Sequence, residues 1–262
     1  MQIRGTIKSK EGLAMNRYKT DEYELEYIES EVSSKILWEN HCHGQFEMIA
    51  VEKGDINIML EGKSYRLKKG QAAIISPLFY HSVTANEKGS YKRVTVLFGI
   101  TAVPAVIRKK FESLGISIAN LPISWIDTVK KICQKSEREI YAPLAQSLMI
   151  QAFYEALENA KSPVESETDE FLQKSIAYID AHLHEKILLE DLARNISRSK
   201  SSFCHLFEEK MHISPKQYIQ QKKLALASKL IGEGVPKTKA ALMIGYENYS
   251  NFYRIYQKNI KN

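Results

Sequence analysis

Three histidines and a glutamate in the N-terminal half of the chain have the residue types and spacing of a ligand or metal site. His41 and His43 flank Cys42, so both imidazoles point to one face if this segment is a β-strand. Glu47 follows in the same segment, and His81 comes from a later one. Three imidazoles and a carboxylate suit Zn, Fe, Mn or Ni. They also suit the polar lining of a small-molecule pocket or a set of structural hydrogen bonds. We favour the pocket, for which no cofactor is expected, and keep a divalent transition metal as the alternative.

Aromatic side chains that could form the apolar walls of such a pocket lie near these residues in the sequence. Small-molecule sites are lined mostly by apolar and aromatic groups with a few polar ones among them. Taken singly, each aromatic is also compatible with ordinary core packing. The expected effector-binding residues are Trp38, His41, His43, Phe46, Glu47, Phe79, Tyr80 and His81.

A second kind of chemistry is indicated by a helical hairpin pattern that occurs twice, at residues 189–207 and 239–256. Each copy has a small residue in a short first helix, then a polar turn, then a second helix with aromatics at the i, i+4 spacing of a buried face. A turn between two crossing helices, the second with a polar outer face, is the geometry that enters a DNA major groove. The repeat therefore predicts a protein that reads two grooves.

The elements that must position the histidines are short and rich in β-forming residues, from Tyr23 to about Phe98. Glycine-containing turn signals at 53–55, 61–63 and 69–71 separate the runs. Strands this short and this regularly spaced predict a small barrel or sandwich. The clearest runs are 56–60, 64–67, 73–75 and 93–98. Residues 1 to about 20 are polar, and we expect them to be poorly ordered.

From Val103 the hydrophobic period becomes helical, and two long helices between 124 and 158 either cover the sheet or form a dimer seam. The polar segment 159–169 is the expected linker. Ile176, Ile179 and Leu183 mark a first helix beyond it, and a long helix from about 215 to 231 joins the two hairpins. Its length of about 25 Å would help to place the recognition helices about one DNA turn, ~34 Å, apart.

The charge of the chain is concentrated on the repeated segment. Residues 170–262 hold 15 Lys and Arg against 9 Asp and Glu, which is the whole formal excess of +6. Phosphate neutralisation supplies most non-specific DNA affinity, so this balance favours DNA as a partner. Three cysteines without a CxxC motif indicate a reducing compartment. The N-terminus lacks the apolar core of a signal peptide, and no apolar run reaches the roughly 18 residues of a membrane span. We therefore expect a cytoplasmic protein with no membrane partner.

Residues 175–258 resemble the DNA-binding domain of the AraC/XylS family of bacterial transcription regulators. The residues that carry the resemblance are Ala193, Ser197, Phe207, Ser214-Pro215-Lys-Gln-Tyr218-Ile219, Leu224-Ala-Leu-Ala227, Gly245-Tyr246 and Phe252-Tyr-Arg254-Ile-Tyr256. The regulatory domains of this family are cupin-like. The spacing His41-x-His43-x3-Glu47-x6-Gly54, with His81 for the second motif, resembles the cupin barrel in turn. Phe79 departs from that pattern, because metal-binding cupins usually carry glycine there.

Carried over by position, the resemblance implies which side chains face DNA. The first recognition helix would direct Ser201, Cys204 and His205 toward bases and Lys200 and Ser202 toward phosphates. The second would offer Tyr249, Ser250, Tyr253 and Arg254. Arg254 can bond guanine in a bidentate fashion, the commonest specific contact, whereas Cys204 is better suited to a merely solvent-facing position.

Three departures from the family pattern weaken parts of this interface. Glu208 and Glu209 stand where lysines are usual, which reduces attraction to the DNA backbone. Residues 237–239 place two lysines where apolar residues usually begin the second hairpin, so we expect a short or loosely packed helix. The sequence stops at Asn262 without the tail that normally supports the second hairpin, so the last helix is expected to be absent or the sequence truncated.

The sequence as a whole predicts an α+β protein of two domains. A cupin-like β-barrel with following helices (20–158) senses an effector and dimerises, and an all-α domain with two helix-turn-helix motifs (170–262) binds DNA. The expected function is a regulator of transcription, by default an activator, that binds double-stranded promoter DNA and a small effector as a homodimer, with RNA polymerase as a further candidate partner. Two alternatives remain open at this point. One is a metal-dependent cupin enzyme with a helical appendage, and the other is a constitutive DNA-binding protein whose barrel only dimerises.

Overall fold

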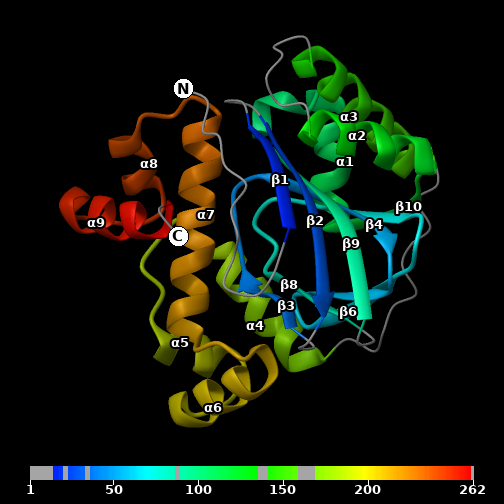
Figure 1. Ribbon diagram of the computed structural model, residues 1–262. Coiled ribbons are helices and arrows are strands. Elements are labelled where there is room, and N and C mark those ends of the chain that lie inside the picture. Colours follow the sequence, from blue (N-terminus) through cyan, green and yellow to red (C-terminus); the bar gives the residue numbers. More distant parts are fainter. Residues whose placement is uncertain are drawn as a thin grey trace.

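The computed structural model describes residues 14–19, 23–32, 36–85, 89–134, 141–158 and 169–260. Within them a β-rich N-terminal part and an all-helical C-terminal part lie side by side, with the long helix α7 (Pro215–Gly232) running along the β-rich part (Figure 1). The expected α+β fold with a cupin-like N-terminal part is confirmed. Most of the expected linker lies outside the described residues, and Asp169 at its end caps the first helix of the C-terminal part.

Two antiparallel sheets make up the β-rich part. The larger contains, in spatial order, β1 (Ala14–Lys19), β2 (Tyr23–Val32), β9 (Gly89–Phe98), β4 (Phe46–Lys53), β7 (Gln71–Ile75) and β10 (Ile116–Asn120). The smaller contains β3 (Ile36–His41), β8 (His81–Ala85), β5 (Ile56–Leu60) and β6 (Lys63–Leu67). The four predicted β-runs lie within β5, β6, β7 and β9.

Alternation of side chains along the strands gives the larger sheet two buried faces. On one face the side chains of Met48, Val94 and Val96 pack beneath helices. On the other face the side chains of Ile49 and Val51 pack against the smaller sheet. The helices that cover the first face are α1 (Ala105–Leu114), α2 (Ile123–Gln134) and α3 (Tyr141–Glu158), which lie together beside the sheet in Figure 1. The second face is the interior between the sheets, where the candidate site lies.

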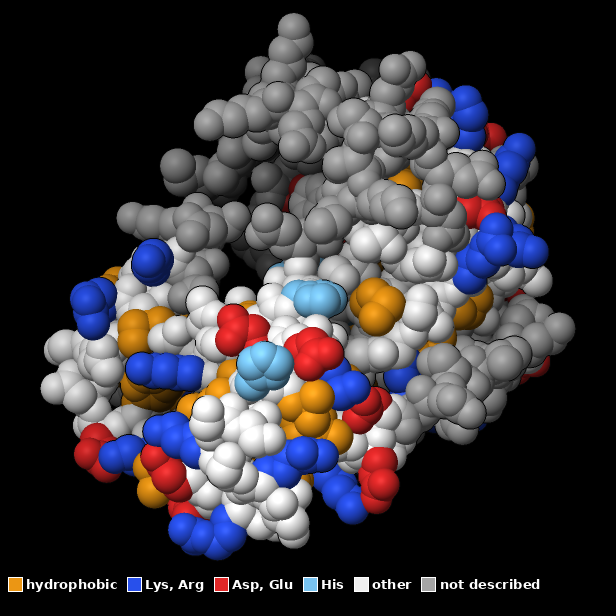
Figure 2. Space-filling model, turned by 90° about the horizontal axis from the view of Figure 1, so that it is seen from below, with side chains coloured by type: hydrophobic (Ala, Val, Ile, Leu, Met, Phe, Trp, Pro, Cys, Tyr) orange, Lys and Arg blue, Asp and Glu red, His pale blue; other side chains and the backbone are white. Residues whose placement is uncertain are grey.

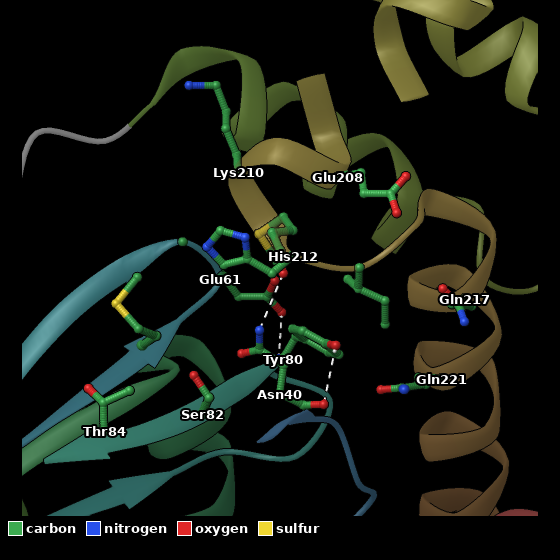
Figure 3. A pocket seen from close by; sticks show the side chains of 14 residues that line it. Asn40, Glu61, Tyr80, Ser82, Thr84, Glu208, Lys210, His212, Gln217 and Gln221 are labelled. Atoms are coloured by element: carbon green, nitrogen blue, oxygen red, sulfur yellow. Dashed lines mark hydrogen bonds between the residues drawn. The ribbon is translucent and has the colours of Figure 1, made fainter. Parts of the chain in front are cut away.

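The turn between β5 and β6 has a conformation that matters for the site. Glu61 and Gly62 have φ angles of 48° and 80°, the left-handed pair of a tight hairpin turn in which glycine is favoured. The predicted turn signal at 61–63 thus forms a two-residue hairpin. It projects the Glu61 carboxylate away from the sheet toward the helical part (Figure 3).

Six helices form the described C-terminal part. They are α4 (Glu170–Ala181), α5 (Leu189–Asn195), α6 (Lys200–Met211), α7, α8 (Lys237–Met243) and α9 (Tyr249–Ile260). The two hairpins repeat in detail. Ala193 and Ala241 are buried, and the residue four positions later, Ser197 or Gly245, has positive φ, 57° or 76°. At Gly245 an added Cβ would lie 2.8 Å from the Glu185 backbone, so only glycine permits that approach.

One expectation about local structure needs correction. The polar N-terminal segment is expected to be poorly ordered, yet Ala14–Lys19 pairs with β2 as an antiparallel edge strand, because the backbone groups at the free edge of β2 offer a row of hydrogen-bond partners.

The second hairpin is expected to begin in a short or loosely packed helix. The helix α8 is short, with seven residues like its counterpart α5. Lys237–Lys239 are exposed, but Ala240 and Ala241 are fully buried, so the helix is packed against the core.

None of the helices in the described ranges has both the length and the apolar character needed to cross a bilayer.

We expect Phe153→Ala in α3 to reduce the free energy of unfolding by about 3–5 kcal/mol, the usual cost of deleting a buried phenyl ring. Phe153 is 2% exposed and contacts the rings of Phe46, Phe98 and Phe111. Denaturant unfolding of the whole chain measures the change. Gln151, exposed on the same helix, is the control, and its replacement by alanine should change stability by no more than about 0.5 kcal/mol.

Candidate functional site

The predicted histidine cluster is assembled by the two sheets. His41 ends β3, His43 follows it, Glu47 lies on β4, and His81 begins β8. One potential ligand atom from each residue lies within 4.8 Å of all the others. The Glu47 Oε2 atom is 2.8 Å from His81 Nε2, 3.1 Å from His43 Nε2 and 4.0 Å from His41 Nε2. Glu47 and His81 are buried, and His41 is the most exposed member, at 33% of its side chain.

Backbone carbonyls fix the tautomers of two of these histidines. His81 Nδ1 lies 2.9 Å from the Phe79 carbonyl oxygen, and His43 Nδ1 lies 3.0 Å from that of Gln45. A carbonyl only accepts hydrogen bonds, so both Nδ1 atoms must carry the proton. In the neutral rings the Nε2 lone pairs therefore face the Glu47 carboxylate, which is also an acceptor. Either extra protons or a cation must separate these groups.

The pKa shifts of Glu47 and His81 show how protons alone can neutralise the charges of the cluster. Burial would raise the pKa of Glu47, but hydrogen bonds from His43 and His81 outweigh it and hold the pKa well below its usual range. Burial would lower the pKa of His81, and the adjacent Glu47 carboxylate raises it instead. A Glu47 carboxylate beside a His81 imidazolium is thus one stable state of the cluster.

A divalent transition metal is the other species that the donor set suits. Four ligand atoms placed tetrahedrally around one ion at about 2.1 Å lie roughly 3.4 Å apart. The observed separations from Glu47 bracket that value. Metal-ligating histidines commonly donate their other ring N–H to a carbonyl, as His43 and His81 do here. The four residues therefore fit a metal without rearrangement of the groups that orient them.

The interior between the sheets holds further polar residues that sequence reasoning missed. Tyr91, Arg93 and Thr95 alternate along β9, and the last two pair with Val51 and Ile49, which face the interior. All three are at least 95% buried. The Thr95 Oγ1 has no hydrogen-bond partner among the described residues, whereas the Tyr91 hydroxyl lies near the Arg93 side chain. Buried polar atoms without partners are rare and point to a missing partner such as a ligand or water. Polar and apolar residues alternate over 93–98 in the sequence, and this signal could have placed Arg93 and Thr95 on one face of the strand.

Two of the expected aromatic wall residues lie elsewhere. Phe46 points to the opposite face of the larger sheet, where it contacts Phe153 beneath α3. Its side chain must do so because its neighbour Glu47 points inward, and successive side chains of a strand alternate. Tyr80 is 2% exposed but packs on Tyr218 of α7, with ring centroids 5.0 Å apart. Phe79 packs against the core between the sheets, and of Trp38 the structure describes the backbone alone, paired with Val83.

Residues 78–81 connect the cluster directly to the helical part. The Leu78 carbonyl accepts a hydrogen bond of 2.7 Å from Lys222 on α7, the Phe79 carbonyl contacts His81, and the Tyr80 ring packs on α7. On the other side of the cluster, His43 is followed by Gly44. A Cβ at Gly44 would lie 2.5 Å from backbone atoms of α7. A change in the positions of His43 or His81 therefore reaches α7 through adjacent backbone.

Lys222 is the centre of a buried ion-pair cluster between the two parts. Its ammonium is 2.9 Å from Glu61 on the β5–β6 turn and 2.9 Å from Asp180 on α4, and its side chain is 2% exposed. Burial would lower the pKa of Lys222, but Glu61 and Asp180 raise it above its usual value. The Tyr218 hydroxyl donates to the second oxygen of Glu61. Both oxygens of the Glu61 carboxylate, in the β-rich part, thus accept hydrogen bonds from α7 in the helical part.

The first recognition helix, α6, presents most of its expected DNA-facing residues to solvent. Lys200, Ser201, Ser202 and His205 are exposed, whereas Cys204 is partly buried against the helical core. Lys200 pairs with Glu190 at 2.7 Å. Figure 2 shows basic and acidic side chains mixed over one face of the molecule. Any DNA contact by Lys200 therefore competes with an internal ion pair.

The second recognition helix, α9, exposes all four of its expected residues. Tyr249 and Tyr253 are 39% and 43% exposed, with Ser250 and Arg254 also at the surface. Arg254 donates one hydrogen bond of 3.2 Å to Asn251 on the same helix. A guanidinium has five N–H donors, so this exposed side chain keeps donors for a base edge.

The fold and these hairpins define a DNA-binding protein with a cupin-like sensing part, and comparison with known proteins identifies the family. Residues 22–176 match the family model for the AraC-like ligand binding domain, and residues 192–261 match that of a helix-turn-helix domain. The first match alone covers more than half of the chain, so the protein belongs to the AraC/XylS family of transcription regulators. This is a non-enzymatic family, and the predicted alternative of a metal-dependent enzyme is wrong.

Individual relatives are distant. The chain is 22% identical over 244 residues, 85% of its length and 79% of the relative's, to a protein of Escherichia coli K12 called the uncharacterized HTH-type transcriptional regulator YdiP. It is 34% identical over 82 residues, about a third of each chain, to the probable transcriptional regulator LumQ of Photobacterium leiognathi. Among solved structures it is similar to ToxT of Vibrio cholerae O395, with 9% identity, a TM-score of 0.45 and coverage of 91% and 94% of the two chains.

We expect Lys222→Met to reduce the free energy of unfolding by about 3 kcal/mol or more, because it leaves Glu61 buried without its cation. Urea unfolding followed by circular dichroism measures this change. Lys216→Met, at an exposed position of the same helix, is the control. A loss no larger for Lys222→Met than for the control would contradict the assigned role of the ion pair.

Proposed function

We propose that the chain is a one-component transcription activator in which the β-rich part senses an effector and α6 and α9 read promoter DNA. In this proposal residues 20–158 sense and dimerise, 159–169 link the parts, and 170–262 bind DNA. The observation that carries it is the continuous contact from the histidine cluster through residues 78–81 to Lys222 on α7. The helix α7 joins both hairpins. An effector that prefers one arrangement of the cluster shifts the population of molecules competent for DNA.

The effector site in this proposal is the interior between the sheets. It contains His41, His43, Glu47, His81 and Phe79, with Trp38 retained from the sequence. The inward-facing hydroxyl of Thr95 is added as a binding group, because it has no partner among the described residues and can bond a ligand. Phe46 and Tyr80 are left out, since one supports α3 and the other α7.

A divalent transition metal is a second candidate occupant of the cluster, supported by the two fixed tautomers. His41, His43, Glu47 and His81 would hold it. The ion would supply a fixed positive charge that neutralises Glu47 and stiffens the link between β3, β4 and β8. It would also give an effector with oxygen or nitrogen ligands a point of attachment.

Dimerisation is proposed through α3. Leu144, Ile150 and Tyr154 are 42%, 39% and 60% exposed on this helix, although its other face packs on the sheet. The helix thus has the features of both roles that its sequence left open, as a cover for the sheet and as an apolar surface for a second copy. A dimer would supply two pairs of reading helices to one promoter, and RNA polymerase remains a proposed further partner.

We expect Arg254→Ala to weaken binding to the protein's own upstream DNA by about 1–3 kcal/mol, with relaxed preference at one base pair. Footprinting at a fixed, stated salt concentration measures it, and a reporter gene under the same promoter tests activation. Lys258→Ala, later on the same helix, is the control for a simple loss of charge. Uniform weakening of all DNA sequences by Arg254→Ala, equal to the effect of Lys258→Ala, would contradict base reading by this residue.

If the cluster holds a metal, the purified chain dialysed against micromolar Zn²⁺ or Ni²⁺ will retain about one ion, and His81→Ala will lose it. Elemental analysis gives the ratio of ion to protein. His205→Ala, which removes an exposed histidine on α6, controls for adventitious binding. A wild-type chain that retains no ion would refute the metal and leave the effector pocket as the role of the cluster.

A further inference from the structure

A cavity of about 810 Å³ lies between the β-rich part and the helical part, outside the barrel interior (Figure 3). Its floor is the outer face of the smaller sheet. Ser82 pairs with Met59 and Thr84 with Asn57, at positions that alternate with the inward-facing Val83. Its opposite wall is the end of α6 and the first turns of α7. The lining residues of that wall are Glu208, Lys210, Met211, His212, Ile213, Gln217 and Gln221.

The charged groups of the Glu61 and Lys210 side chains near this cavity are already engaged. Glu61 bonds Lys222, Tyr218 and the Tyr80 backbone N–H, and Lys210 lies 2.6 Å from Asp169. In Figure 3 the Lys210 ammonium points away from the cavity. A ligand with a carboxylate or phosphate would find no uncommitted lysine or arginine among the described lining residues, and Glu208 adds a negative charge to the lining, so the site is not matched to an anion.

Neutral polar groups, by contrast, are left without partners. The Gln221 Oε1 atom is buried and accepts no hydrogen bond from any described residue. In Figure 3 its amide extends from α7 toward Asn40 and Tyr80. The hydroxyls of Ser82 and Thr84 also lack hydrogen bonds within the part of the chain that the structure describes. Amides and hydroxyls each donate and accept, and they therefore match the alternating donors and acceptors of a heteroaromatic ring edge.

The apolar groups of the cavity come from both walls. Met59 lies on the sheet side, and Met211 and Ile213 lie on the helix side. Methionine adapts its shape and makes favourable contacts with aromatic rings. A flat ring would contact apolar side chains on both faces while its edge bonds the amides and hydroxyls. The volume lies within the range of ordinary small-molecule sites.

We propose that this cavity is a second ligand site, distinct from the barrel interior, for an uncharged heteroaromatic base or its nucleoside. The ligand would bridge the sheet and the end of the recognition helix α6, where Asn40 already donates a hydrogen bond of 3.3 Å to the Met211 carbonyl. Occupancy would fix the direction of α6 relative to the β-rich part. The proposal does not depend on the barrel interior as an effector site, or on any metal.

The test is calorimetric titration of the full chain with adenine, adenosine, guanosine and uridine, with adenosine monophosphate and ribose as comparison probes. At least one base or nucleoside should bind, more tightly than either comparison probe. Thr84→Val and Gln221→Leu, which keep side-chain size, should each weaken that binding about tenfold, the effect of one lost hydrogen bond to a ligand. Thr128→Val and Gln151→Leu, on helices α2 and α3 on the other side of the larger sheet, should leave the affinity unchanged.

Three results would overturn the proposal. The first is the absence of binding by every base and nucleoside at millimolar concentration. The second is preferential binding of ribose or the monophosphate. The third is binding that Thr84→Val and Gln221→Leu leave unchanged when circular dichroism shows both variants folded. Footprinting of the same variants without added base separates this outcome from a failure of DNA binding, because the proposal predicts that their basal footprint persists.

Discussion

The buried Lys222 ammonium is the constraint on which the arrangement of the two parts depends. A charge removed from water is tolerated only where opposite charges and hydrogen bonds surround it. Lys222 finds them in Glu61 from the β5–β6 turn, Asp180 from α4 and the Leu78 carbonyl. No two of these three groups come from the same element, so the ammonium is satisfied only when the helical part is seated on the sheet. Separation of the parts leaves an unpaired charge on at least one side.

This requirement gives the histidine cluster a route to the DNA-binding helices. Residue 78 bonds Lys222, residue 79 orients His81, and residue 80 packs on Tyr218. Three successive residues therefore serve both the cluster and α7, and none can move alone. On the other side of the cluster, Gly44 lies against the backbone of α7 and forms a second close contact between the cluster and this helix. Coupling between sensor and reader then follows from packing at short range, and needs no long pathway.

Sequence patterns predicted the features that depend on local chemistry. The turn glycines, the period-two strands, the cluster of His41, His43, Glu47 and His81, and both hairpins are all local or short-motif signals. The directions of Phe46 and Tyr80 were predicted wrongly. Both faces of the larger sheet, which contains Phe46, are buried and suit an apolar residue, and Tyr80, next to β8 of the smaller sheet, packs on α7 instead. The burial of Lys222 was not predicted, since its acidic partners, Glu61 and Asp180, are far from it in the chain. Such long-range pairs have no periodic signature.

The two hairpins have similar backbones but are held by contacts with different parts of the molecule. That difference bears on how the DNA-binding part can be controlled. The end of α6 contacts the β-rich part through Asn40 and lines the cavity, and its Lys210 pairs with Asp169 at the start of α4. The second hairpin is held through α7 and the Glu185 backbone, both of which belong to the helical part. Because α7 spans both hairpins as one helix, a shift at α6 changes its angle to α9. Under the proposed function, in which the two helices read successive grooves, displacement of the first hairpin alone would be enough to control DNA binding, while the second keeps its exposed face.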